Sequence, residues 1–266
     1  MRDLLSDLDQ GALSEDPVDR ARAAQRPTLP KRFYTDVSVG EGQGADGLNG
    51  FTILLDGRPV RTPARSLLLS PSRKLAEAMA VEWAAQKDVI DPFSMPLTRL
   101  VNVAQDRVSV ETDAVREDVV RYAGSDMLFY RAEGPQSLVE RQARHWDNVL
   151  DWLREEHGAR FYLAEGIRHV AQPDESLERV RALVPSSVMK LAAVHSITSL
   201  TGSALLALAV AQGHMDGQTA WRAAHVDEDW NRDQWGEDEL ATERRLAREA
   251  EMNAAVHMLA LLEADE

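Results

Sequence analysis

The chain has 266 residues, of which 44% are hydrophobic and 28% are charged, and its formal net charge is -14. This is the composition of a globular protein, and its acidity disfavours nucleic acid and anionic membrane surfaces as partners because both are negatively charged. The absence of cysteine excludes disulfides, thiolate metal sites and cysteine nucleophiles.

Residues 1–28 are polar. They include six acidic residues and no apolar stretch of signal-peptide length. This composition disfavours a secretory signal or a mitochondrial presequence. We expect a polar tail ahead of a domain that begins at residue 29.

Residues 29–108 carry strand signals followed by one helix. Residues 31–39 alternate in the period of a strand, and two short extended runs flank Asp56-Gly57, a strong hairpin signal. The segment ARSLLLS indicates a further strand, and Pro71 precedes a helical pattern over residues 72–86. We therefore predict a small N-terminal α/β domain with an antiparallel sheet.

Helical patterns dominate residues 109–266, which we predict to form a C-terminal all-α helical bundle and so to complete an α+β fold. The longest uncharged run, residues 191–211, approaches the length of a membrane span. It contains His195, three Ser and two Thr, which interrupt its apolar surface. We expect it to be the central buried helix of the bundle rather than a membrane span.

Known catalytic and nucleotide-binding motifs provide little evidence for an enzyme in this sequence. Residues 42–47 match the G-x-G-x-x-G dinucleotide pattern, but a strand rather than a helix follows, which favours a loop between strands. The sequence has no Walker-type phosphate loop, no HExxH zinc motif and no nucleophile elbow. We therefore predict no catalytic residue, no cofactor and no metal site.

The segment HVDEDWNRDQWGEDE, residues 225–239, contains seven acidic side chains around two tryptophans. On a helix, Asp227, Glu228 and Asp229 point about 100° apart and do not converge on one metal ion. One interpretation is a solvated acidic helix face with a structural Trp230, which the spacing alone favours. The other is an acidic surface whose aromatic anchors, Trp230 and Trp235, capture a basic and apolar patch of a partner.

A family resemblance favours the second interpretation. In order and spacing, the chain resembles the ATP synthase α-subunit assembly chaperones, the bacterial relatives of mitochondrial ATP synthase assembly factor 2. The resemblance covers residues 30–262, and the segments that carry it are KRFY, LDGRPVRTPAR, AVEWAAQKDVIDPFSMPLTRLVNVAQD, YAGSDMLFYRAEGP, LVERQARHWDNVLDWL, LTGSALLALAVAQG and HVDEDWNRDQWGEDE.

The resemblance implies a non-enzymatic, cytoplasmic protein that binds the unassembled α subunit of the soluble head of ATP synthase and hands it on for assembly with β. It implies the same α/β-then-helical fold and places the partner-binding residues at Asp227, Glu228, Asp229, Trp230 and Trp235. Trp83 is expected to serve packing, and a monomer is the simplest state. Two alternatives stay open: a carboxylate- and metal-dependent hydrolase, and a scaffold or adaptor with another client.

Overall fold

A three-stranded antiparallel sheet forms one end of the molecule. The computed structural model describes residues 29–45, 47–166 and 168–263, so the predicted polar tail lies outside the described residues. The strands pair in chain order: β1 (Val37–Gln43), β2 (Asn49–Leu55) and β3 (Arg58–Pro59). Asp56 and Gly57 have φ values of 47° and 77°, the left-handed pair of a two-residue hairpin turn. The predicted hairpin is confirmed.

The glycine-rich segment connects two strands, as predicted. Gly42 lies in β1 opposite Gly50 of β2, and no helix follows the loop. The dinucleotide interpretation is therefore excluded by the local structure. The predicted strand over residues 31–39 begins only at Val37, and the ARSLLLS segment forms the isolated bridges Arg61–Leu67 and Phe51–Ser70 rather than a strand.

A layer of short helices joins the sheet to the rest of the fold. Ser72 caps the predicted helix by accepting a hydrogen bond from the Leu75 amide at 3.1 Å. This layer comprises α2 (Arg73–Ala84), the 3-10 turn η2 (Pro92–Ser94), α3 (Pro96–Val103) and the π-helical segment η3 (Ala104–Val108). Helix α2 packs on β1 and β2, and α3 packs on α2, α7 and α11.

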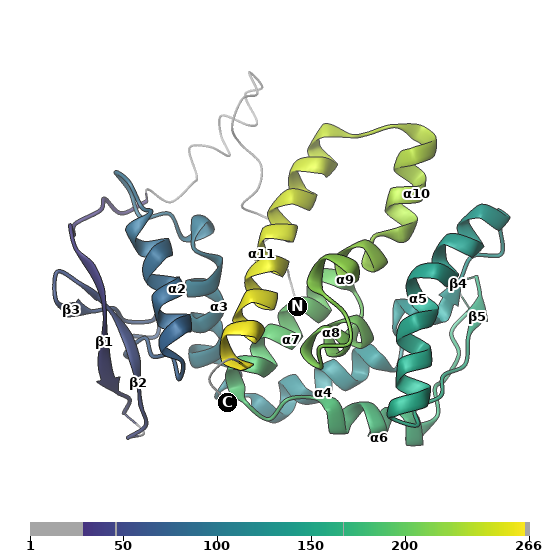
Figure 1. Ribbon diagram of the computed structural model, residues 1–266, viewed down its shortest axis with the longest axis horizontal. Helices are drawn as coiled ribbons and strands as arrows, with labels where there is room; N and C mark the ends of the chain where they lie inside the picture. Colours follow the sequence, from purple (N-terminus) through teal and green to yellow (C-terminus); the bar gives the residue numbers. More distant parts are fainter. Residues whose placement is uncertain (1–28, 46, 167, 264–266) are drawn as a thin grey trace.

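The remaining elements are helices apart from a parallel pair of two-residue strands, and residues 157–163 and 168–173 are irregular. The elements are α4 (Thr112–Ala123), η4 (Met127–Phe129), β4 (Tyr130–Arg131), α5 (Gln136–Glu156), β5 (Ala164–Glu165), α6 (Asp174–Leu183), α7 (Val188–Thr201), α8 (Ala204–Ala211), α9 (Gly217–Ala224), α10 (Val226–Trp235) and α11 (Glu239–Glu263). Figure 1 shows the sheet at one end, α5 with β4 and β5 at the other, and α11 between them.

The expectation of one central helix over residues 191–211 is wrong, because the apolar run is two helices. Gly202 ends α7 with a φ of 71°, which glycine adopts without steric cost. Ser203 then caps α8 by accepting a hydrogen bond from the Leu206 amide at 3.0 Å. Both helices are buried, so the predicted burial is confirmed while the predicted continuity is not.

One hydrophobic core runs through both parts of the chain. It includes Ile53 and Leu75 near the sheet and Ile197 and Leu205 in the helical part, all with 0% exposure. The α+β fold is confirmed, whereas the domain boundary at residue 108 stays a prediction. Over the described residues, none of the helices combines the length and the apolarity that a bilayer span requires.

Candidate functional site

Helix α10 carries the acidic segment and ends in a projecting turn. Asp227, Glu228 and Asp229 occupy its first turn, where negative charge interacts favourably with the helix dipole. The helix stops at Trp235 because Gly236 follows with a φ of 90°. At the top of Figure 1, α10 and the first turns of α11 project beyond the neighbouring helices.

Asp229 is a buried structural residue. Both of its carboxylate oxygens accept hydrogen bonds from Arg245 of α11, one of them at 3.2 Å, and Arg232 lies 3.2 Å away. Burial alone would raise the pKa of Asp229, but the hydrogen bond and the charge of Arg245 outweigh it, so the pKa is lowered. Asp229 therefore stays ionised and joins α10 to α11.

Two further acids of this segment tie α10 to α5. The side-chain amide of the buried Gln142 donates to Asp227 at 2.8 Å, and Arg141 lies 2.6 Å from Asp233. Gln142 also accepts a hydrogen bond from the Ala132 amide at 2.8 Å, which fixes its orientation. These contacts are structural, although the Asp227 and Asp233 side chains remain partly accessible.

Glu228 points to solvent, with 71% of its side chain exposed. Its nearest ionisable neighbour is His225, whose Nε2 lies 3.7 Å away. His225 is buried and donates from Nδ1 to the Trp221 carbonyl at 2.8 Å. Burial is the main cause that lowers the pKa of His225, so the ring is neutral near pH 7 and does not neutralise the Glu228 charge.

The two tryptophans differ. Trp230 is half-buried, whereas Trp235 is 85% exposed, an unusual position for an indole. The structure therefore separates the five predicted residues into a buried ion pair at Asp229, partly engaged positions at Asp227 and Trp230, and free positions at Glu228 and Trp235.

The chain after Trp235 extends the free surface. Leu240 and Leu246 are each 61% exposed, and Glu237, Glu239 and Glu243 are exposed beside them. We call residues 235–246 the α10–α11 tip. Asp238 caps α11 by accepting from the Ala241 amide at 3.1 Å, so the tip has a defined conformation. These leucines were not predicted as surface residues, because nothing in their spacing shows that α11 projects.

The segment EWAAQ, which lies in one of the stretches that carry the family resemblance, has a structural role. Glu82 accepts hydrogen bonds from the Leu97 and Thr98 amides, both at 2.8 Å, and from the Thr98 hydroxyl at 2.7 Å. It therefore caps α3 from α2. Gln86 accepts from the Asp91 amide at 2.7 Å, and the half-buried Trp83 packs against the core, as expected.

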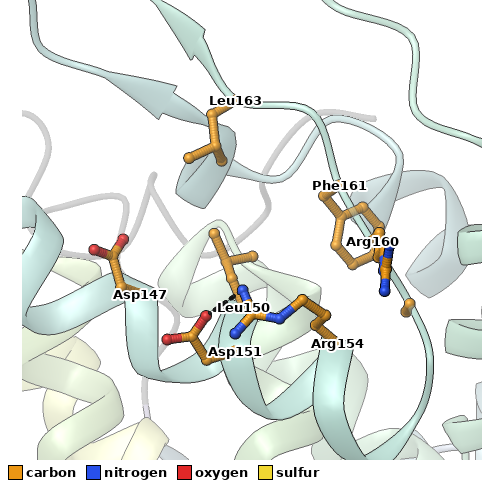
Figure 2. A pocket seen from close by; sticks show the side chains of 8 residues that line it. Asp147, Leu150, Asp151, Arg154, Arg160, Phe161 and Leu163 are labelled. Atoms are coloured by element: carbon orange, nitrogen blue, oxygen red, sulfur yellow. Dashed lines mark ion pairs between the residues drawn. The ribbon is translucent and has the colours of Figure 1, made fainter.

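A surface hollow of about 540 Å³ lies between α5 and the segment around Phe161. Figure 2 shows Asp147, Asp151 and Arg154 along α5, with Arg160, Phe161 and Leu163 on the facing segment. Asp151 is 2.8 Å from Arg154, and Asp147 is 2.8 Å from Arg131. Each of the two carboxylates that line the hollow therefore has an arginine partner.

The metal-dependent hydrolase alternative has no ligand set in the described part of the chain. No three His, Asp or Glu side chains converge there in a group able to hold a metal ion. Within the acidic segment, Asp229 faces Arg245 and Glu228 faces solvent, so the two carboxylates diverge. The arrangement suits contact with a protein better than chelation.

The model of the family described as ATP12 chaperone protein matches residues 31–154. This range ends in α5 and excludes α10. Among solved structures, the Atu1473 protein from Agrobacterium tumefaciens, described as a candidate chaperone, is 49% identical with a TM-score of 0.83. That comparison covers 98% of this chain and 97% of the other.

The structure of Atp12 from Paracoccus denitrificans is 38% identical with a TM-score of 0.80, covering 87% of this chain and 98% of that one. A mutant of the same protein with lysine in place of an aspartate is 37% identical, also with a TM-score of 0.80, over 87% of this chain and 97% of that one. The likeness thus extends over the helical part as well as the sheet. The chain belongs to the ATP12 chaperone family.

Proposed function

We propose that this chain is an assembly chaperone of ATP synthase that binds the unassembled α subunit of the soluble head. It shields the surface that α later offers to β and then hands α on for assembly. It acts as a cytoplasmic monomer, without catalysis and without a cofactor. Family membership and the chemistry of the α10–α11 tip support this proposal.

The observation that carries the proposal is the exposure of Trp235, 85%, among exposed acidic side chains. An exposed indole with two exposed leucines is the apolar centre of a binding surface, and an acidic rim provides steering and specificity. The tip has four acidic residues and two arginines, and one of these, Arg245, is engaged by Asp229. A basic patch with apolar residues is therefore the complementary partner surface.

Release needs no nucleotide. A subunit awaiting assembly exposes apolar surface that promotes aggregation. A chaperone that covers this surface through a small projecting tip binds weakly enough for the larger, permanent β interface to displace it by competition. Hand-over then follows from relative affinity alone.

The test is a co-expression pull-down of the α subunit, with β as a second prey. The tip variant replaces Trp235, Leu240 and Leu246 by Ser. The matched control replaces three other exposed apolar residues by Ser: Phe33, Val81 and Val110, with 72%, 70% and 78% exposure. Circular dichroism and urea unfolding check the fold of each bait. Lysine at Asp227 and Asp229 is avoided because both carboxylates hold α10 in place.

We expect the wild type and the control variant to bring down soluble α, and the tip variant to lose it. Equal capture by all three baits would show that the client surface lies elsewhere on the chain. Failure of the wild type to capture α, with other proteins captured instead, would contradict the α client and favour the adaptor alternative.

A further inference from the structure

The charge of the chain is divided unevenly along the sequence. Residues 29–108 carry ten Lys and Arg against nine Asp and Glu, whereas residues 109–266 carry sixteen against 29, so the formal charges are +1 and -13. Three exposed arginines of the first part, Arg58, Arg61 and Arg65, follow one another around β3. We call residues 58–65 the arginine loop. In Figure 1, β3 lies at the end of the molecule away from α10.

The arginine loop is held in one conformation by the π-helical segment η3. Asp106 of η3 accepts hydrogen bonds from the Thr62 hydroxyl at 2.7 Å and from the Ala64 amide at 2.9 Å. Gln105 accepts from the Leu69 amide at 2.9 Å, just beyond the loop. π-helical turns occur frequently at functional sites.

Arg65 has an unusual backbone conformation. Its φ is 68°, in the left-handed region that glycine or asparagine occupies at lower cost. Arg61 stabilises this turn by donating from its guanidinium to the Arg65 carbonyl at 2.9 Å. Strained backbone of this kind clusters at binding sites, where surrounding contacts maintain it.

The three guanidinium groups have no carboxylate partner within the ion-pair distance among the described residues. The acids nearby are already engaged by backbone amides: Asp106 as above, and Asp56 by the Thr35 and Asp36 amides at 3.1 and 2.8 Å. Among the residues that the structure describes, no ion pair therefore takes up the positive charge of the loop.

We propose that the arginine loop is a second docking surface, which takes an acidic segment of the protein client. Guanidinium groups pair with carboxylates through two parallel hydrogen bonds, so arginines on a rigid loop suit this chemistry. The net charge of -14 opposes the extended negative surfaces of nucleic acid and of an anionic membrane, whereas a short acidic segment meets mainly the local positive charge of the loop. The inference rests on the proposed chaperone function for the identity of the client.

The direct test uses a fluorescein-labelled decaglutamate peptide and anisotropy at about 50 mM NaCl, where charge contacts are weakly screened. The first variant replaces Arg58, Arg61 and Arg65 by Gln, and a second replaces them by Lys. The matched control replaces the exposed Arg144, Arg168 and Arg179 by Gln. We expect the Gln variant to weaken peptide binding about tenfold and the Lys variant to weaken it less, because lysine keeps the charge but not the paired hydrogen bonds, while the control stays within about threefold of wild type.

A second measurement uses the α subunit in place of the peptide, so that the two proposals fail separately. A weaker affinity of the Gln variant for α supports the inference. Equal affinities of wild type and Gln variant for α, or equal peptide binding by Gln variant and control, overturn it while leaving the chaperone proposal intact. If wild type does not bind α, the proposed function fails and the peptide result alone decides whether the loop is a docking surface.

Discussion

At the residue scale, Glu82 joins two helices through one carboxylate. Burial is the largest effect on its pKa and raises it, although three hydrogen bonds from α3 oppose the change. Replacing Glu82 by Ala leaves the Leu97 and Thr98 amides without acceptors. We expect the free energy of unfolding to fall by about 1 to 3 kcal/mol, measured by urea denaturation.

The matched control for Glu82 is Glu77→Ala on the same helix. Glu77 forms an i,i+4 pair with Arg73, and 55% of its side chain is exposed. Such a pair contributes at most about 0.5 kcal/mol. Similar losses of unfolding free energy for the two variants would show that the hydrogen bonds that Glu82 accepts from α3 stabilise the fold no more than an exposed ion pair does.

The buried carboxyl group of Asp126 should make the stability of the protein depend on pH. It is fully buried and accepts hydrogen bonds from the Ser203 hydroxyl and the Leu205 amide, both at 3.0 Å. Burial raises its pKa from 3.8 to about 6, so the folded protein binds the proton more tightly than the unfolded chain does. The contribution of Asp126 to stability is therefore full below about pH 4 and is lost as the pH rises through 6.

The measurement compares the wild type with Asp126→Asn, whose side chain does not titrate. Between about pH 4 and pH 7 the wild type should lose roughly 3 kcal/mol of unfolding free energy relative to this variant. The difference between the two proteins removes the effect of the other acids. If the difference in unfolding free energy between the two proteins were constant over this range, the pKa of Asp126 would be ordinary. The control is Asp113→Asn, which removes an exposed carboxylate instead of a buried one.

At the element scale, α10 combines a structural face with a free face. Asp229→Asn weakens the contact with the partly buried Arg245 and should lower the unfolding free energy by about 1 to 3 kcal/mol. Trp235→Ser removes an 85% exposed side chain and should cost less than about 0.5 kcal/mol. Urea unfolding of both variants checks this, and a large loss for Trp235→Ser would place the indole in a packing role.

The elements show why sequence patterns reach some features and miss others. The Asp56-Gly57 turn is predictable because its two left-handed residues are adjacent. The break at Gly202 was not predicted, because an apolar run indicates burial but does not show where a helix ends. The start of α8 is also stabilised by a hydrogen bond between Ser203 and Asp126, 77 residues away, which no local pattern shows.

The candidate site was likewise predictable only in part. The acidic segment and its two tryptophans are evident in the sequence, but which acid faces inward depends on Arg245, 16 residues from Asp229 in another helix. Gln142, which orients Asp227, lies 85 residues away. Contacts at such separations arise from helix packing rather than from local pattern.

At the scale of the whole molecule, the division of charge predicts electrostatic steering. Exposed acids at Glu228, Glu239 and Glu243 lie on the part of the chain with a formal charge of -13. Under the proposed function, attraction between this surface and a basic patch of the client should speed encounter and be screened by salt. The association rate constant should fall about tenfold between about 50 and 500 mM NaCl, while dissociation changes little.

Stopped-flow or biosensor kinetics with the α subunit tests this steering. Replacing Glu228, Glu239 and Glu243 by Gln should reduce the salt effect to about twofold, because the local field is removed while the apolar anchors remain. A control that neutralises Glu111, Asp113 and Glu156, exposed acids outside α10 and α11, has the same net charge. It should keep nearly the wild-type salt dependence. If both variants lose it equally, the steering comes from net charge alone, and the α10–α11 tip has no directional role in encounter.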